Sequence, residues 1–390
     1  MRHSLGLVLL AAVLRAPVTC LAPVLGLVRD AYGLGGVAVS LLTTLPVLCL
    51  GLFAPLAPAL ARRAGTEATV AGALAVLTAG SLLRALPSTA ALFGGTVLVG
   101  AGIAVANVLL PAHVKQHLRV GRHTGLAMTV MSGTAALAAA LAVPLAEAAG
   151  WRAAVAVWAL PALAAATAWT ALARRAGGRA VAPAPPRPAR PEVVLLRSPL
   201  ALALTGFLGA VSLMFYVLTA WLPELMQAQG YTAAQSGLMV SVLLTIGIPL
   251  GFATPVVAAR RAGQGPVVAV VAAAMGLGLA GLLLVPGAGW LWVVLLGLGN
   301  GCAFPLAVTL LTLRAADPHT AARLSGIAQT GGYLLAALGP LAVGLLHAAT
   351  GGWTAALLLL LALVLPETAA GLLAARPDIK AARVAHPNDL

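Results

Sequence analysis

Charge is scarce in this sequence of 390 residues. Asp, Glu, Lys and Arg together make up 8% of the chain, whereas soluble domains carry about a quarter. Hydrophobic residues make up 61% of it. A chain with so few charged side chains cannot cover a water-facing surface of ordinary size, which excludes a soluble globular domain. The composition predicts an all-α integral membrane protein that crosses the lipid bilayer several times.

Signatures of ATP hydrolysis and of catalysis are also absent. The chain has two lysines, Lys115 and Lys380, and neither completes the phosphate-binding pattern Gly-x-x-x-x-Gly-Lys. The sequence contains no His-Glu-x-x-His and no Gly-x-Ser-x-Gly. We therefore expect no enzymatic activity, no cofactor and no metal. Any transport must draw its driving force from a gradient or from a partner.

Apolar residues fall into about twelve runs of roughly 18–25 residues, separated by charge clusters and by Pro/Gly breaks. The predicted spans lie near residues 5–28, 36–60, 68–86, 91–112, 124–146, 153–172, 200–226, 234–258, 266–286, 290–312, 324–347 and 353–374. An even number of spans returns both termini to one side of the membrane. Nineteen of the 23 Lys and Arg residues fall on that side. The positive-inside rule therefore predicts cytoplasmic termini in a plasma (bacterial inner) membrane. The net charge of +14 then reflects topology and not nucleic-acid binding.

One long interruption divides the chain. The segment Arg174–Arg197 carries six arginines around a proline-rich core and cannot bury an apolar face. We predict a cytoplasmic linker there. The expected domains are an N-terminal six-helix half, the linker, a C-terminal six-helix half and a cytoplasmic tail, at residues 1–173, 174–198, 199–375 and 376–390.

Short repeats support two homologous halves. Residues 124–129, Thr-Gly-Leu-Ala-Met-Thr, correspond to residues 325–330, Ser-Gly-Ile-Ala-Gln-Thr, at an offset of 201. Ala-Arg-Arg-Ala-Gly occurs at both 61–65 and 259–263, at an offset of 198. Two pseudo-equivalent halves are typical of transporters that hold their substrate near the membrane midplane.

Several motifs resemble those of a known transporter family. They are Leu-Arg-Ala-Pro at 14–17, Leu-Thr-Thr-Leu-Pro-Val at 42–47, Ala-Asn-Val-Leu-Leu-Pro at 106–111 and Leu-Ser-Gly at 324–326. In these motifs the chain resembles the major facilitator superfamily, and within it the cyanate/nitroimidazole porter group. The resemblance implies twelve transmembrane helices in two six-helix pseudo-repeats. It also implies a substrate such as a cyanate-like anion or a nitroimidazole-like compound.

Arg15 is the strongest candidate for substrate binding. It lies about halfway along the first span, where inserting an arginine costs about 2.5–3.5 kcal/mol. Its guanidinium either pairs with backbone carbonyls as a structural charge or binds an anion. We favour the second interpretation, because the planar fork suits small oxyanions, carboxylates and polar heterocycles. No Asp or Glu lies at a comparable depth in the predicted spans, so the substrate is expected to supply the counter-charge.

Polar side chains in other spans form a second group of candidates. Asn107 and Asn300 lie in the fourth and tenth spans. Amide side chains in a bilayer also bridge helices, which leaves both a binding and a structural interpretation open for these two residues.

The eleventh span carries Gln329 and Tyr333 at i, i+4 spacing, on one helix face. Its repeat partner, the fifth span, carries Met128 and Ser132 at the same spacing. We expect these four residues to line the substrate cavity.

The seventh span adds aromatic side chains. Phe215 and Tyr216 are expected to wall the site, and Phe215 stands 200 residues after Arg15. The cavity should therefore be cationic on one wall and aromatic on the other. Glu224, near the outer end of the same span, is a candidate for proton coupling.

His113 and His117 resemble a metal-binding pair, because they stand one helical turn apart at the inner end of the fourth span. Lys115 lies between them, and no third ligand is evident in the sequence. We interpret this stretch as a solvated, basic helix end.

We therefore predict a monomeric secondary transporter that moves a small anionic or polar molecule by alternating access. Glycines at 297–301 and 331–332 should let helices approach closely. Two alternatives stay open: a proton-coupled drug or metabolite efflux pump, and a transport-inactive membrane sensor with the same fold. The lack of a deep carboxylate argues against the pump.

Overall fold

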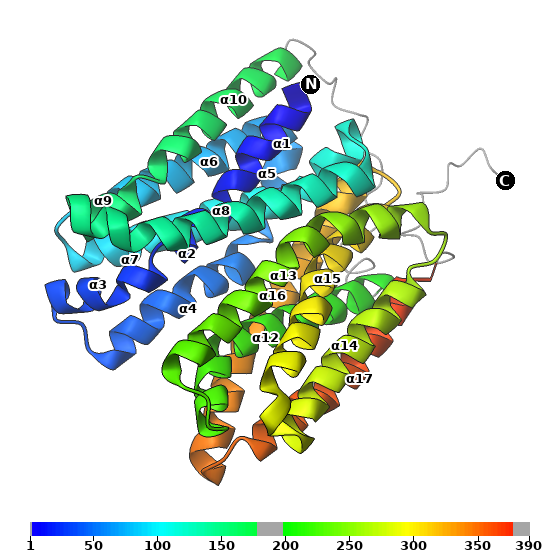
Figure 1. The fold of residues 1–390 in the computed structure, drawn as a ribbon. Helices are drawn as coiled ribbons and strands as arrows, with labels where there is room; N and C mark the ends of the chain where they lie inside the picture. Colours follow the sequence, from blue (N-terminus) through cyan, green and yellow to red (C-terminus); the bar gives the residue numbers. More distant parts are fainter. Residues whose placement is uncertain (1, 178–197, 377–390) are drawn as a thin grey trace. The chain divides into compact units, whose positions relative to one another are not determined.

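The computed structural model describes residues 2–177 and 198–376. Across these ranges the chain is helical and contains no β-strand (Figure 1). Within the described residues, eleven helical segments are long and apolar enough to cross a membrane, with Arg2–Tyr32 counted as one, and a bent pair within residues 41–64 raises the number to twelve. The predicted all-α fold class with twelve spans is confirmed. Most of the predicted linker 174–198 lies outside the described residues, as does the predicted tail beyond Arg376.

The helices follow one another along the chain with short connections. The first part contains α1 (Arg2–Val13), α2 (Ala16–Thr19), the 3-10 helix η1 (Ala22–Val24), α3 (Leu25–Tyr32), α4 (Gly36–Phe53), α5 (Leu56–Ala64), α6 (Thr66–Leu83), α7 (Thr89–His117), α8 (Val120–Ala149), α9 (Trp151–Ala156) and α10 (Ala159–Gly177). The second part contains α12 (Pro199–Ala228), α13 (Ala233–Arg260), α14 (Gly265–Leu284), the 3-10 helix η2 (Pro286–Ala288), α15 (Gly289–Arg314), α16 (Pro318–Thr350) and α17 (Thr354–Ala374).

Two compact units make up the chain. The first unit comprises Met1–His113 and Leu126–Pro191, and the second comprises Val114–Gly125 and Glu192–Leu390. The division falls inside α7 and α8, each of which is one continuous helix. The domain boundaries expected from the sequence stay predictions.

The first two predicted spans are not single straight helices. The first is broken into α1, α2, η1 and α3, with Pro17 and Pro23 in the first turns of α2 and η1. The second bends by 54° between α4 and α5, where Pro55 precedes α5. Proline donates no backbone hydrogen bond and its ring clashes with the preceding turn, so each break coincides with a proline.

The start of α16 is set by a side-chain cap. The carboxylate of Asp317 accepts hydrogen bonds from the backbone amide of Thr320 at 2.9 Å and from its hydroxyl at 2.7 Å. Burial opposes the charged form, but these hydrogen bonds outweigh it and lower the pKa of Asp317 below its ordinary value. The cap fixes where α16 begins, and with it the position of Gln329 and Tyr333 along that helix.

Glycines let helices of the second unit approach closely, as predicted. A Cβ placed on Gly301 of α15 would lie 2.7 Å from the Cα of Gly247 on α13. A Cβ on Gly332 of α16 would lie 3.1 Å from the backbone nitrogen of Gly209 on α12. In a bilayer such close contact supplies van der Waals attraction that apolar burial cannot supply.

The first unit uses the same device where α6 crosses α7. A Cβ on Gly80 would lie 2.7 Å from the carbonyl oxygen of Gly95 and 2.8 Å from the backbone nitrogen of Val99. Only glycine fits at this crossing without moving a backbone.

Gly80→Ala should lower the free energy of unfolding by about 1–3 kcal/mol, because the added methyl group has to displace the backbone of α7. Gly72→Ala on the same helix is the matched control, since nothing lies within 4 Å of a Cβ at that position. Thermal unfolding of the purified proteins in detergent measures both. Equal stability of the two variants would contradict the close crossing.

Candidate functional site

Arg15 lies at the break in the first span. α1 ends at Val13 and α2 begins at Ala16, so Arg15 is the N-cap of α2, with φ of −124° and ψ of −37°. Its carbonyl oxygen accepts hydrogen bonds from the amides of Val18 at 3.0 Å and Thr19 at 3.1 Å. Val13 and Ala16 are fully buried, whereas the side chain of Arg15 is partly exposed. Arg15 is thus more exposed than the residues on either side of it.

Two side chains hold the broken segment in place. Arg84, 1% exposed, donates a hydrogen bond from Nη1 to the carbonyl oxygen of Pro17 at 2.6 Å. The hydroxyl of Thr19 donates to the carbonyl oxygen of Ala135 on α8 at 3.2 Å. Sequence reasoning missed the role of Arg84, because its acceptor stands 67 residues earlier and is available only where the first span breaks.

The predicted residues of the first unit lie on three elements. The hydrogen bond between α2 and α8 brings the segment after Arg15 against the helix that carries Met128 and Ser132. Met128 is buried, whereas Ser132 is partly exposed. Asn107 lies on α7 and is also partly exposed. Arg15 and the pair on α8 are therefore brought to neighbouring elements, and Asn107 lies on a third.

In the second unit, α16 presents Gln329 and Tyr333 on one face, and each is 3% exposed. The Gln329 amide donates from Nε2 to the hydroxyl of Ser325, one turn earlier, at 2.7 Å. This bond stays within α16, so it orients the amide without linking two helices.

The other predicted residues of the second unit lie on α12 and α15. Phe215 and Tyr216 of α12 are partly exposed, and their rings meet edge to face, with centroids 5.3 Å apart and an interplanar angle of 74°. Glu224 of the same helix is exposed. Asn300 of α15 is buried, between glycines that contact α13 and α14. Since α12 and α16 meet at Gly209 and Gly332, the aromatic pair and the Gln329 face lie on packed helices.

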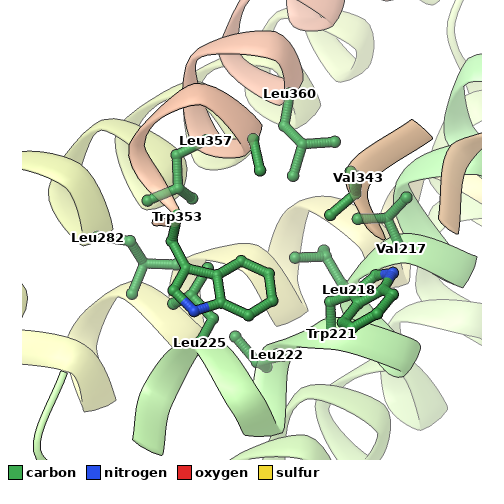
Figure 2. A pocket seen from close by; sticks show the side chains of 11 residues that line it. Val217, Leu218, Trp221, Leu222, Leu225, Leu282, Val343, Trp353, Leu357 and Leu360 are labelled. Atoms are coloured by element: carbon green, nitrogen blue, oxygen red, sulfur yellow. The ribbon is translucent and has the colours of Figure 1, made fainter. Parts of the chain in front are cut away.

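A cavity inside the second unit does not include any of these residues (Figure 2). It lies among α12, α14, α16 and α17, with Trp221 and Trp353 beside leucine and valine side chains. Its volume is about 10 Å³, roughly the room of one water molecule. A cavity this small and apolar does not suit an anion or a polar ring.

Sequence reasoning also missed the burial of Glu367. This residue of α17 is 3% exposed, and its Oε2 atom has no hydrogen-bond partner among the described residues. The sequence places Glu367 towards the inner part of the twelfth span, but the hydropathy of a uniformly apolar helix does not show which way a side chain points.

The interpretation of His113 and His117 as a solvated helix end is wrong for His113. His117 is exposed, but His113 is fully buried. Its ring packs against that of Trp169 on α10, with centroids 4.6 Å apart, and its Nδ1 lies 4.0 Å from Oε1 of Glu67 on α6. Side chains from neighbouring helices therefore cover this part of α7.

The sequence matches the family model of the Major Facilitator Superfamily over residues 7–340. The chain belongs to the major facilitator superfamily. The sequence is 38% identical over 356 residues to the 2-nitroimidazole transporter of Escherichia coli (strain K12). The alignment covers 90% of each chain. The sequence is 29% identical over 354 residues to the cyanate transport protein CynX of the same strain, covering 90% of this chain and 91% of that protein.

A solved structure of the proton:xylose symporter XylE superimposes on this major facilitator with a TM-score of 0.74. The match covers 96% of this chain and 94% of that one at 14% identity, so it bears on the fold alone. The predicted superfamily, its twelve-helix fold and the cyanate/nitroimidazole porter group are confirmed. The protein is a multi-pass membrane transporter and not an enzyme.

Arg84→Ala should lower the free energy of unfolding by about 1.5–3 kcal/mol, because it removes a charged hydrogen bond to the carbonyl oxygen of Pro17. Arg84→Lys should recover part of the loss. Arg63→Ala, which changes an exposed arginine at the end of α5, serves as the control. Thermal unfolding in detergent measures all three. An Arg84→Ala protein as stable as the control would show that the broken span does not depend on this bond.

Proposed function

We propose that this protein is a secondary transporter of the plasma membrane that moves a small anion or a polar heterocycle by alternating access. Arg15 is its central substrate-binding residue. The observation that carries the proposal is the position of Arg15 at the break of the first span, partly exposed between fully buried neighbours. Discontinuous helices with polar groups at the break are where transporters of this kind bind substrate.

The chemistry of a guanidinium at this place favours one substrate class. A permanent charge inside a span costs about 2.5–3.5 kcal/mol, and an anionic or strongly polar ligand offsets that cost each time it binds. The planar fork donates two parallel hydrogen bonds, which suits a pair of acceptor atoms. A cyanate ion and the nitro group of a nitroimidazole both offer such acceptors. The names of the two Escherichia coli relatives agree with this class.

The other residues predicted from the sequence are proposed to complete the substrate site. Polar side chains come from α7, α8, α15 and α16, the thioether of Met128 comes from α8, and the aromatic pair comes from α12. In this proposal they are Asn107, Met128, Ser132, Phe215, Tyr216, Asn300, Gln329 and Tyr333. A polar ring would stack on the aromatic pair while Arg15 binds its acceptor atoms.

The proposed topology follows from the charge distribution. Nineteen of the 23 Lys and Arg residues fall on the side of both termini, so we place the termini in the cytoplasm. We propose that the transporter works as a monomer, because each chain supplies both six-helix halves.

Arg15→Ala should weaken binding of 2-nitroimidazole or cyanate by about 10-fold to 100-fold, which corresponds to the loss of one charged hydrogen-bonding group. Arg15→Lys keeps the charge but not the planar fork, so its affinity for the ligand should lie between those of the wild type and Arg15→Ala. Arg29→Ala is the matched control, since this exposed arginine of the same broken span pairs with Asp30 at 3.0 Å. Ligand-dependent thermal shifts and flux into proteoliposomes provide the measurements.

Undiminished binding by Arg15→Ala would refute the role of Arg15. Specific binding by the wild type without any flux would favour the sensor over the transporter. No binding of either compound would refute the substrate class but leave the fold unaffected.

Proton coupling is the second candidate mode, and the burial of Glu367 favours it. Acids inside membrane spans commonly carry the coupled proton in transporters. Glu367 lies within α17 and is 3% exposed, whereas Glu224, the acid that the sequence suggested, is exposed. We propose that Glu367 is the better placed of the two.

Glu367→Gln should abolish the stimulation of transport by an imposed pH gradient while leaving substrate binding intact, because glutamine cannot release a proton. Glu147→Gln, at the exposed end of α8, is the control, and Glu224→Gln tests the acid suggested by the sequence. Flux into proteoliposomes with and without the gradient is the measurement. Persistent stimulation in the Glu367→Gln protein would exclude Glu367 as the coupling acid.

A further inference from the structure

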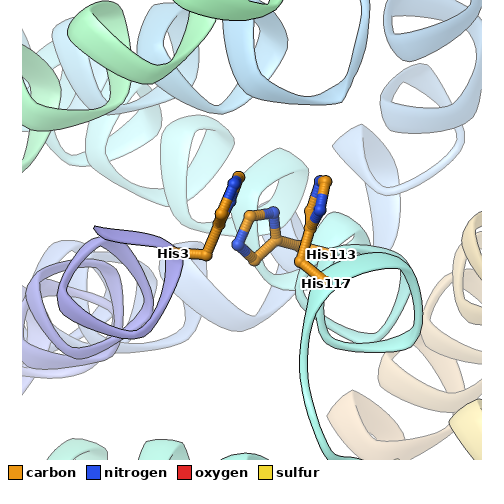
Figure 3. Close-up of side chains that lie close together, drawn as sticks. All are labelled: His3, His113 and His117. Carbon is orange, nitrogen blue, oxygen red and sulfur yellow. The ribbon is translucent and has the colours of Figure 1, made fainter. Parts of the chain in front are cut away.

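Three histidines from two helices converge at one end of the first span. His3 lies in the first turn of α1, and His113 and His117 lie in the last turns of α7 (Figure 3). One ring nitrogen of each lies within 4.8 Å of those of the other two. We propose that these three imidazoles bind a divalent transition-metal ion of the Zn²⁺ class. The proposal does not depend on the proposed substrate site.

The helices themselves set most of this geometry. α7 is continuous through His117, so the spacing of four residues places His113 and His117 on the same face, one turn apart. The ring of His3 meets that of His113 with centroids 5.3 Å apart. The beginning of α1 is held to α10, because Trp169 donates from Nε1 to the carbonyl oxygen of Gly6 at 2.9 Å. His3 therefore lies on a helix that a hydrogen bond fixes to α10.

Burial of the three ligands differs in a way that suits an ion site. His113 is fully buried, His3 is partly exposed and His117 is exposed. The buried ring supplies a fixed ligand at the inner side. The exposed ring leaves a path by which an ion and its remaining water ligand can enter.

The carboxyl group of Glu67 lies beside the buried ring of His113. Oε1 of Glu67 lies 4.0 Å from Nδ1 of His113, and Glu67 is 9% exposed. A carboxylate that orients the far ring nitrogen of a metal-binding histidine is the common arrangement around such ions. Because Nδ1 of His113 faces Glu67, we assign Nε2 of His113 as the metal ligand in this proposal. The carboxylate also offsets part of the charge of a bound cation.

The ligand set selects the class of ion. Imidazole nitrogens suit Zn²⁺, Ni²⁺ and Cu²⁺, whereas Mg²⁺ and Ca²⁺ require oxygen ligands. In a tetrahedral zinc site with bonds of about 2.0–2.1 Å, the ligand nitrogens lie about 3.3 Å apart. The ring nitrogens lie within 4.8 Å of one another, so the proposal requires the side chains of His117 and His3, which are not buried, to move closer when the ion binds.

Titration of Zn²⁺ into the full-length protein in detergent, without a polyhistidine tag, tests the proposal by calorimetry. The wild type should bind about one ion per chain. His3→Ala and His117→Ala should each weaken binding at least about tenfold, and Glu67→Gln should weaken it by about 10-fold to 100-fold. Binding should also weaken as the pH falls, because protons compete for the imidazoles.

His123→Ala is the matched control, since this histidine of α8 lies outside the cluster and its Nδ1 lies 3.1 Å from the carbonyl oxygen of Arg119. The test uses His3 and His117 because neither is buried, so their alanine variants are expected to fold, which a thermal melt without metal verifies. Zinc affinity that is unchanged in both variants would overturn the proposal. So would a wild type without saturable binding, or an equal loss of affinity in His123→Ala.

Discussion

A backbone amide or carbonyl that leaves a helix inside a bilayer must find a partner within the protein, and the first span depends on this constraint. Its helix stops at Val13 because prolines follow, and the carbonyl of Pro17 is then satisfied by Arg84. The hydroxyl of Thr19 donates a hydrogen bond to α8 and so links the next turn to that helix. These two bonds let the chain keep a break in which Arg15 is partly exposed. The proposed binding residue therefore depends on a structural arginine that does not contact the substrate in this proposal.

The two units carry different side chains at one pair of corresponding positions. At the offset of 201 that relates the halves, His113 corresponds to Arg314. Arg314 is buried, donates from Nε to the carbonyl oxygen of Ala374 at 2.8 Å, and also donates to the side chain of Gln264. A permanent cation thus joins α15, α17 and the start of α14. The corresponding place in the first unit holds a histidine beside Glu67, a pair that can accept a metal instead of carrying a fixed charge.

The candidate residues show how far a sequence can locate a site. Arg15 was identifiable because a charge in an apolar run is an energetic anomaly that needs no structure to notice. Gln329 and Tyr333 were assigned to one face from their spacing, and α16 places them so. Arg84 and His3 were not identifiable, because their partners stand 67 and 110 residues away and come close only when helices pack. Glu367 was visible as an acid, but its burial was not.

The sequence by itself determined the membrane class, the number of spans and the transporter family, and it predicted two repeated halves. Those properties follow from hydropathy, charge placement and local motifs, all of which are encoded within short stretches of chain. Only the tertiary structure decided that Arg84 and Thr19 hold the broken first span, that His113 is buried and that three histidines converge. Each of these depends on contacts between distant helices. In an apolar solvent, polar groups make such contacts because the bilayer offers them no water.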